Sequence, residues 1–385
     1  MGSGIRRRLL ATVAVFALTY AAFAGGHPGL AAAEVARYVP GPPPAVSADA
    51  IYVFDATSNT ELFAINPDRP LPPASLTKIV SALVVLDLAD LDELVEIVPE
   101  DLVDVEQSQV GLVAGDRLSA RDLLIGMLVP SGNDATLAMA RHLGQQALGE
   151  GATPADAVAW FVSKMNEKAL SLGTTNTFFA NPTGLDAPGH TMSARDVAIV
   201  TGYALQQPLF AEIVAKTSAV LASETRPEGY SVVTTNDLLA EGLVAGVKTG
   251  TTPEAGGCLV TTFAVGPNEI VAVVLGSDLA ETADGGQDNS ARYADTRALI
   301  QAVNTDYVWL DPAAPGVVDG LPEELRVWDV TLADGALQPV PASGVAELRY
   351  RVVLGPPAAP AAPAGEVIFF VGDRLLAERT AVQAG

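Results

Sequence analysis

The chain has 385 residues, 49% of them hydrophobic, so it is long enough for a large core and a second module. Its net charge of −23 and its pI of about 4.3 argue against a nucleic-acid partner, because phosphate binding needs a basic surface. The single cysteine, Cys258, excludes an internal disulfide, and the three scattered histidines lack zinc-binding spacing, so no metal and no other cofactor is expected.

The first residues, 1–33, are predicted to be an export signal or an N-terminal anchor. Three consecutive arginines precede the uncharged run 9–24, which ends in Ala22-Phe23-Ala24, a sequence typical of signal cleavage. The run is shorter than the roughly 20 residues of a spanning helix, and both cleavage and anchoring stay open. Either fate predicts a protein that acts outside the cytoplasm. A stiff proline-rich spacer follows over 34–46.

A domain over 47–308 is expected next, and it begins with a β-hairpin. Alternating apolar residues predict paired strands at 51–54 and 61–64, with a turn between them. Pro72 and Pro73 then predict the first turn of a helix that runs to about Leu88.

The middle of this domain is predicted to be mainly helical after a strand-and-loop excursion. Apolar periodicity, and a capping box formed by Ser193 and Asp196, are the observations behind the helices. The excursion is expected over 95–118, and helical segments are expected at 123–129, 135–143, 161–172 and from Ser193.

The last third of the domain changes to strands. Residues 244–247 lead into Lys248, and near-continuous apolar runs at 258–265 and 270–275 indicate strands buried on both faces. A final helix is predicted at 292–303. Because the domain begins in a hairpin and ends in strands and a helix, we expect one sheet built from both ends of the domain.

A linker is predicted at 309–321, where proline and glycine are frequent, and a small β-rich module is predicted at 322–385. Its strands are expected from a period of two, and a low-complexity loop at 355–365 is expected to be a spacer. The expected strands are 325–330, 347–353, 367–370 and 375–382.

Ser75 and Lys78 form the first of three motifs that carry chemistry. Residues three apart share one face of a helix, so the two side chains can touch. Serine is a weak nucleophile until a base lies within hydrogen-bond reach. Lysine can be that base only if burial or another cation lowers its pKa from about 10.4. The pair therefore predicts a second positive group nearby, and Lys248 can supply it.

The other two motifs follow in order along the chain. Ser131-Gly132-Asn133 is a polar turn between two apolar helical stretches, where side chains can point into a cleft. Lys248-Thr249-Gly250 begins a predicted strand. Each motif alone also fits an ordinary cap, turn or strand, but the ordered set of three is a strong signal.

Together the motifs resemble the serine penicilloyl-transferase fold of penicillin-binding proteins and serine β-lactamases. They are most similar to the low-molecular-weight D-alanyl-D-alanine carboxypeptidases. The resemblance spans about 45–307, and the C-terminal module is compatible with the family's second domain. It implies an α/β fold of the α+β kind, with an antiparallel sheet flanked by helices and followed by a small all-β module. Supporting stretches are 123–126, 161–166, 181–185 and 292–294.

The resemblance also implies a reaction. The nucleophile attacks the D-Ala–D-Ala bond of a peptidoglycan stem peptide, water releases the acyl group, and β-lactams trap the same serine as inhibitors. The implied catalytic residues are Ser75, Lys78, Ser131 (proton relay) and Asn133 (positioning); the implied substrate-binding residues are Lys248, Thr249, Gly250 and Thr251. The oxyanion hole would be the backbone N–H groups of Ser75 and Thr251.

Two departures from the family pattern and three alternatives accompany this hypothesis. Some relatives carry histidine where this chain has Thr251, so only the backbone of Thr251 is assigned a role. The chain end lacks the family's frequent membrane anchor, so any membrane attachment is expected at the N-terminus. The alternatives are an endopeptidase or transpeptidase of the same family, a class A-like β-lactamase, and a non-catalytic wall-binding protein. The β-lactamase needs a glutamate in a loop between the second and third motifs, but Glu167 lies on a predicted helix and no Glu-x-x-x-Asn loop is evident.

Overall fold

The computed structural model describes residues 38, 40–149, 151–282, 287–333, 335–355 and 359–384. The predicted export segment 1–33 lies outside the described residues. In the part of the chain that is described, no single helix has the length and apolar character to cross a membrane. Helices α5 (Ala194–Leu205) and α6 (Pro208–Val214) pass that test only when taken together, and they are bent by 111° at their junction.

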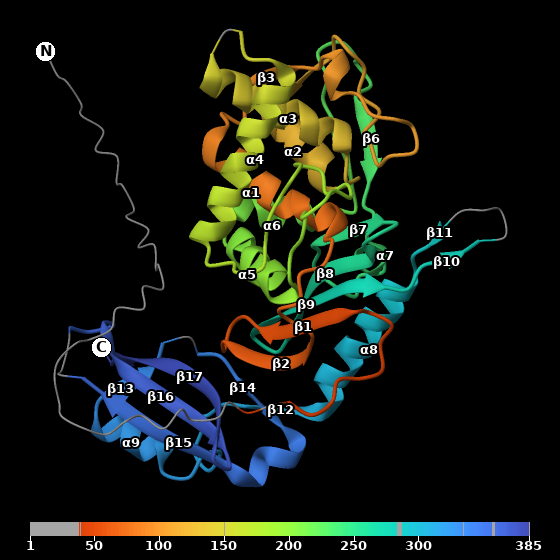
Figure 1. The fold of residues 1–385 in the computed structure, drawn as a ribbon. Helices are drawn as coiled ribbons and strands as arrows, with labels where there is room; N and C mark the ends of the chain where they lie inside the picture. Colours follow the sequence, from red (N-terminus) through yellow and green to blue (C-terminus); the bar gives the residue numbers. More distant parts are fainter. Residues whose placement is uncertain are drawn as a thin grey trace, which may run out of the picture. The chain divides into compact units, whose positions relative to one another are not determined.

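A five-stranded antiparallel sheet lies at the centre of the fold (Figure 1). Its strand order is β2-β1-β9-β8-β7. The predicted hairpin therefore pairs with strands from the end of the domain, and the expected sheet from both ends is confirmed. The strands are β1 (Ala50–Asp55), β2 (Thr60–Ile65), β7 (Lys248–Thr252), β8 (Gly256–Val265) and β9 (Asn268–Ser277). Residues 244–247, predicted to lead into β7 as strand, are not part of it.

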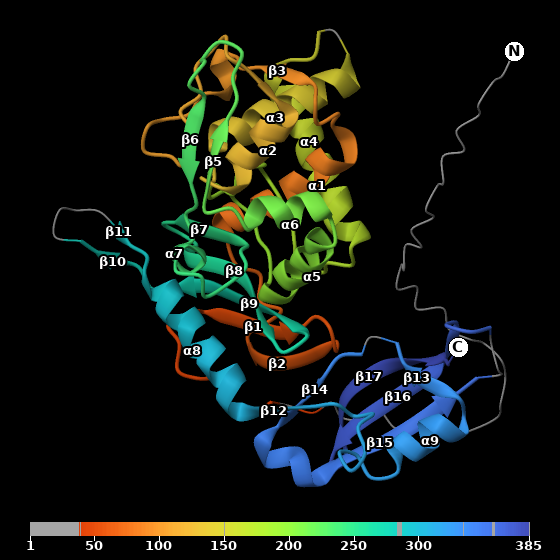
Figure 2. The same ribbon diagram turned by 180° about the vertical axis from the view of Figure 1, so that it is seen from behind.

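Alternate residues of the sheet enter two different hydrophobic cores. Val271 and Val273 pack in the core that contains the helices of the middle of the chain, whereas Ala272 and Val274 pack with helix α8 (Ala291–Asp306). Figure 2 shows α8 on one side of the sheet and helices α5 and α6 on the other. Because both faces are covered, β8 and β9 are apolar almost without interruption, as predicted.

Three helices of the middle of the chain begin earlier than predicted, at Ala120, Asn133 and Pro154. The longest, α4, begins at Pro154, because the Thr153 hydroxyl accepts a hydrogen bond from the Asp156 N–H and proline suits the first helical position. The helices are α1 (Lys78–Leu88), α2 (Ala120–Leu128), α3 (Asn133–Leu148), α4 (Pro154–Ser171), α5 (Ala194–Leu205), α6 (Pro208–Val214) and α7 (Asp237–Ala240). Short elements between them are η1 (Ala74–Thr77), β3 (Leu94–Glu96), η2 (Pro99–Asp101), β4 (Arg117–Ser119), β5 (Ser218–Leu221) and β6 (Tyr230–Val233).

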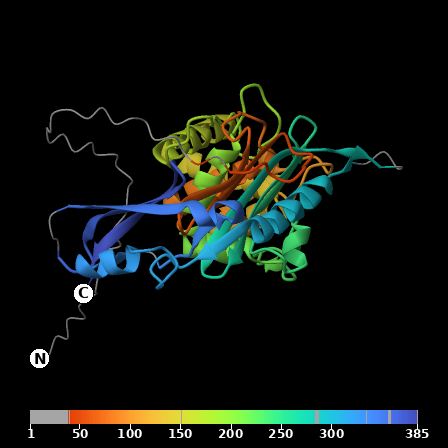
Figure 3. The same ribbon diagram turned by 90° about the horizontal axis from the view of Figure 1, so that it is seen from below.

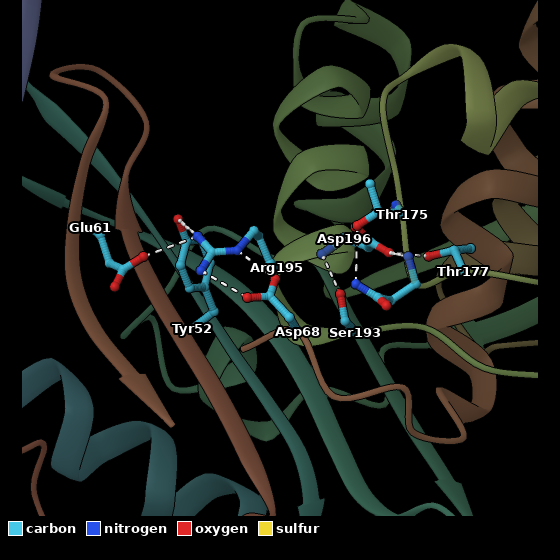
Figure 4. Close-up of polar contacts among 9 residues, drawn as sticks. Tyr52, Glu61, Asp68, Thr175, Thr177, Ser193, Arg195 and Asp196 are labelled. Carbon is cyan, nitrogen blue, oxygen red and sulfur yellow. Dashed lines mark hydrogen bonds and ion pairs between the residues drawn. The ribbon is translucent and has the colours of Figure 1, made fainter. Parts of the chain in front are cut away.

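Helix α5 is capped by Ser193, whose hydroxyl accepts from the Asp196 N–H at 3.1 Å. The predicted capping box is only half formed, because the Asp196 carboxylate turns to the preceding loop instead. It accepts from the Asn176 N–H at 2.7 Å and from the Thr177 hydroxyl at 2.8 Å (Figure 4). The carboxylate thereby fixes the loop that leads toward residues 181–186.

The neighbouring residue, Arg195, ties α5 to the first two strands. Its guanidinium donates to Asp68 at 2.7 Å, and to Glu61 and the Tyr52 hydroxyl at 3.0 Å each (Figure 4). The helix bundle is thus joined to the sheet by a partly buried charged network as well as by apolar packing.

The C-terminal part of the chain has a hydrophobic core of its own, made by residues between Val318 and Ala381. It contains a four-stranded sheet of order β13-β17-β16-β15, drawn in blue in Figure 3, and a ribbon of β12 and β14. Its elements are β12 (Tyr307–Leu310), α9 (Leu321–Val327), β13 (Val330–Leu332), β14 (Gln338–Pro341), η3 (Ala342–Glu347), β15 (Leu348–Leu354), β16 (Pro363–Val371) and β17 (Arg374–Gln383).

The strand predicted at 325–330 is wrong. Residues 321–327 form helix α9, because Pro322 and two glutamates occupy its first turn and Leu321 and Leu325 share one buried face. Only Val330 belongs to a strand, β13.

Candidate active site

Ser75 and Lys78 are in direct contact. The Nζ atom of Lys78 lies 2.8 Å from the Ser75 hydroxyl and donates to the carbonyl oxygen of Thr183 at 2.7 Å. When the amine is neutral, its lone pair can accept the hydroxyl proton of Ser75 while one of its N–H groups keeps the hydrogen bond to the Thr183 carbonyl. The geometry therefore suits removal of a proton from the serine.

Ser75 lies on a 3-10 turn rather than on the α-helix itself. The two prolines are followed by η1, and α1 begins only at Lys78. Ala74, directly before Ser75, has φ of +47°, which is unusual for a residue with a side chain. Ser75 therefore lies at the N-terminal end of the helical segment, where the backbone N–H groups have no hydrogen-bond partner within the helix.

The electrostatic surroundings favour a neutral Lys78. Its side chain is fully buried, and burial, followed by the charge of Lys248, holds the pKa of Lys78 well below 10.5, while Asp134 acts in the opposite direction. The predicted second cation is thus close enough to act on the first. A lysine of this kind can serve as a general base near neutral pH.

The turn of the second motif is buried beside α3. Ser131 has φ of +65° and is 3% exposed, and Asn133 is the first residue of α3. The Asn133 amide nitrogen donates to the Gln107 side chain at 2.8 Å, and its Oδ1 is buried with no hydrogen-bond partner among the described residues. No hydrogen bond in the described ranges joins Ser131 or Asn133 to Lys78. The free Asn133 oxygen is an acceptor that a bound ligand can satisfy.

Asp134, which sequence reasoning did not assign, holds the loop that supplies Gln107. Its buried carboxylate accepts from three consecutive backbone N–H groups, those of Val110, Gly111 and Leu112, at 2.9–3.0 Å. The sequence shows only that an acidic residue follows Ser-Gly-Asn. It does not show that this residue binds the loop at 110–112, more than 20 residues earlier.

The third motif lies on the edge strand β7. Burial, and then the charge of Arg292, lowers the pKa of Lys248 to about 7. The Thr249 hydroxyl hydrogen-bonds to the Thr235 hydroxyl, and Arg292 donates to the Thr251 hydroxyl at 2.7 Å. Hydroxyls and two cations therefore gather along one strand.

Arg292 is a second residue that sequence reasoning gave no role. The residue is 5% exposed, and its guanidinium donates to the Gly250 carbonyl, the Thr251 hydroxyl and the Tyr293 hydroxyl. Among the described residues it has no carboxylate partner within salt-bridge distance, and its Nε is buried without a hydrogen bond. A buried cation without a counter-charge is a site for an anion.

Gly250 brings β7 against the nucleophile turn. A Cβ atom at this position would lie 2.8 Å from both the Ser75 nitrogen and the Ala74 Cβ. Only glycine permits the strand to approach the turn so closely.

The loop 181–186 closes the other side of the turn. The Asn181 side chain accepts from the Gly184 N–H at 2.8 Å, and a Cβ on Gly184 would lie 1.9 Å from the Ala74 carbonyl oxygen. Glu167, the residue considered for a β-lactamase mechanism, lies elsewhere: it is on α4, 62% exposed, and paired with Lys164. The described residues contain no cluster of three metal-ligating side chains.

Comparison with known proteins gives one family match and close structural neighbours. Residues 38–279 match the model of the D-alanyl-D-alanine carboxypeptidase family. The chain is 31% identical to D-alanyl-D-alanine carboxypeptidase DacF of Bacillus subtilis over 280 residues, which cover 70% of this chain and 66% of that relative.

Two solved structures extend the comparison. The Streptomyces K15 DD-transpeptidase superposes with a TM-score of 0.60 at 30% identity, covering 68% of this chain and 98% of that one. Penicillin-binding protein 6B from Escherichia coli gives a TM-score of 0.65 at 24% identity and covers 90% of this chain and 99% of that one, which shows a shared fold that includes most of the C-terminal part.

Proposed function

Because the chain belongs to the D-alanyl-D-alanine carboxypeptidase family, we propose that it removes the terminal D-alanine from peptidoglycan stem pentapeptides through an acyl-enzyme on Ser75. The observation that carries the proposal is the 2.8 Å contact between the Ser75 hydroxyl and Lys78, a buried amine whose pKa is strongly lowered. A serine with such a base at hydrogen-bond distance is an activated nucleophile.

Acylation begins when Lys78 takes the Ser75 proton and the serine oxygen attacks the penultimate D-alanine carbonyl. The negative charge that develops on the substrate carbonyl oxygen is stabilised by the backbone N–H groups of Ser75 and Thr251. One such donor contributes roughly 2.7–4 kcal/mol to the transition state. Ser131 relays the proton to the departing D-alanine amine, and water then hydrolyses the acyl-enzyme.

Two groups supply recognition of the substrate. The terminal carboxylate binds at Lys248, with Thr249 and Arg292 beside it, because Lys248 on β7 and Arg292 on α8 are buried basic groups, and no described carboxylate lies within salt-bridge distance of either. The unpartnered Asn133 oxygen accepts the N–H of a substrate amide. β-Lactams, which carry a carboxylate and a reactive amide, bind the same groups and inhibit the enzyme.

The domain limits and cellular location follow the same proposal. Separate hydrophobic cores support a catalytic domain over 47–308 and a C-terminal module, expected over 322–385; Val318 and Leu321 of the expected linker 309–321 belong to the core of this module. Family members act on peptidoglycan, so this enzyme works outside the cytoplasm at the cell envelope. Residues 1–33 would export it, as a cleaved signal or as an anchor.

A transpeptidase or endopeptidase of the same family is the second candidate, and the likeness to the Streptomyces K15 DD-transpeptidase favours keeping it. These activities use the same residues: in a transpeptidase an amine attacks the acyl-enzyme instead of water, and in an endopeptidase the leaving group is a cross-linked peptide instead of D-alanine. An assay that offers both a pentapeptide and a cross-linked dimer separates them: free D-alanine with tetrapeptide supports a carboxypeptidase, free D-alanine with a new cross-linked product supports a transpeptidase, and cleavage of the dimer supports an endopeptidase. Absence of free D-alanine from the pentapeptide contradicts our choice.

A β-lactamase and an inert wall-binding protein are tested by one experiment. The purified protein is treated with benzylpenicillin and followed by mass spectrometry, with Ser75→Ala as control. We expect an adduct on Ser75 that persists for minutes and is absent from the variant. Turnover of the adduct within a second would indicate a β-lactamase, whereas an unlabelled wild-type protein would indicate an inert one.

A further inference from the structure

His190 lies in the loop before α5, is 3% exposed, and has a partner on each ring nitrogen. Its Nδ1 lies 3.1 Å from the Ala180 N–H, which can only donate, so Nδ1 must be the unprotonated nitrogen. The proton therefore sits on Nε2, which donates to the Thr77 hydroxyl at 2.8 Å. The tautomer is fixed by the backbone.

Thr77 passes this hydrogen bond on to the nucleophile turn. Its hydroxyl accepts from His190 and donates to the Ala74 carbonyl oxygen at 2.8 Å. The Ala74 carbonyl and the Ser75 N–H belong to one peptide unit, which is planar and trans, so the two groups point in opposite directions. Whatever holds the carbonyl in place also aims the N–H.

This peptide unit needs to be held. Ala74 has φ of +47°, and a backbone of this kind persists only where its surroundings determine it. Gly184 and Gly250 pack on the turn from two sides, but they offer contact rather than a hydrogen bond to the carbonyl. The Thr77 hydroxyl is the side-chain donor that this carbonyl has among the described residues, beside the backbone N–H that the 3-10 turn η1 directs toward it.

From these contacts we propose that His190 is a positioning residue, which aims the oxyanion-hole N–H of Ser75 through the Thr77 hydroxyl and the Ala74 carbonyl. The proposal deepens the proposed function and rests on it. His190 does not transfer protons: burial lowers its pKa to about 4, against a smaller opposing effect of Asp186, so the ring stays neutral at neutral pH. It acts on geometry alone.

The test compares four variants by acylation rate with a fluorescent penicillin, by kcat and KM for release of D-alanine, and by thermal midpoint. Thr77→Val keeps the shape and removes the hydroxyl, whereas Thr77→Ser keeps the hydroxyl. His190→Leu removes the ring and both of its hydrogen bonds, and the double variant combines Thr77→Val with His190→Leu. Active-site titration corrects each rate for misfolded protein.

Removal of one oxyanion donor costs about 10²–10³-fold, and a donor that is only misdirected should cost less. We expect Thr77→Val and His190→Leu each to lower the acylation rate and kcat about 10-fold with KM within two-fold, and Thr77→Ser to stay within about three-fold of wild type. Because His190 acts through Thr77, the double variant should be no slower than Thr77→Val.

Three results would overturn the proposal: an acylation rate for Thr77→Val within two-fold of wild type, losses that multiply in the double variant, or a rise in KM with kcat unchanged. Should His190→Leu fail to fold, the Thr77 pair still decides, because valine and threonine have nearly the same shape. If the wild-type protein itself forms no penicillin adduct, the proposed function fails instead, and the two failures are distinguishable.

Discussion

Replacing Lys248 by methionine should stabilise the protein while it abolishes activity. The side chain is 1% exposed, and its pKa falls from 10.5 to about 7 on folding. At 1.36 kcal/mol per pH unit, this change corresponds to roughly 4–5 kcal/mol of unfolding free energy that the buried amine costs when it is charged in the unfolded chain. Loss of its hydrogen bond to the Thr249 carbonyl offsets about 1 kcal/mol.

The effect has a defined pH window. Between pH 7 and 10.5 the unfolded chain binds a proton at this lysine that the folded chain does not, so the wild-type protein gains stability as pH rises. The gain is complete above 10.5, and the cost is full below 7. Lys248→Met lacks this dependence, so its advantage should be largest at pH 6 and should shrink toward pH 10.

Thermal midpoints measured from pH 6 to pH 10 test this reasoning. An advantage of about 3 kcal/mol over roughly 350 folded residues amounts to about 4 °C, at about 2.1 cal/mol/K per residue. Lys216→Met is the matched control, because Lys216 is partly exposed and pairs with Glu212 on the surface; it should change stability by under about 1 kcal/mol. A Lys248→Met protein that melts below wild type at pH 6, or a difference that stays constant with pH, would refute the argument.

Three further substitutions test other contacts. Gly250→Ala places a methyl 2.8 Å from the Ser75 nitrogen; we expect about 1–3 kcal/mol of destabilisation and at least a 10-fold slower acylation, and normal labelling with penicillin would contradict the close approach. Asp134→Asn replaces an acceptor of several backbone N–H groups; urea unfolding should show a loss of about 1–3 kcal/mol, and an unchanged midpoint would speak against its anchoring role. Arg141→Met breaks a pair with Asp101 that is 2.8 Å long and nearly fully buried; we expect about 3–5 kcal/mol of destabilisation by the same assay, reduced when Asp101→Leu is added, and additive losses would exclude a mutual interaction.

The sequence predicted those features that depend on local spacing. The apolar periodicity after Lys78 predicted α1 to its last residue, and the interval between Ser75 and Lys78 predicted a contact that the structure places at 2.8 Å. The unbroken apolar runs predicted β8 and β9, because a strand that is buried on both faces has apolar side chains at successive positions.

Features that depend on distant partners were not predicted. Arg292 was noted only as the start of a helix, and its place beside Thr251 follows from how α8 crosses β7, which no local pattern encodes. His190 is one of three scattered histidines, and nothing near it in the sequence points to Thr77, 113 residues away. Helix α9 was mistaken for a strand because an apolar residue at every second or third place fits either period over so short a segment.

The scarcity of lysine makes the two buried amines easy to observe one by one. The chain has only five lysines, and the other three, Lys164, Lys168 and Lys216, each lie against a carboxylate. Reductive methylation with ¹³C-formaldehyde, a reagent small enough for a narrow cleft, would give a carbon spectrum of few signals. The signal of Lys248 should shift near pH 7 and that of Lys78 well below the usual range of a lysine, and a bound penicillin should move both at once, so the enzyme carries its own reporter of occupancy.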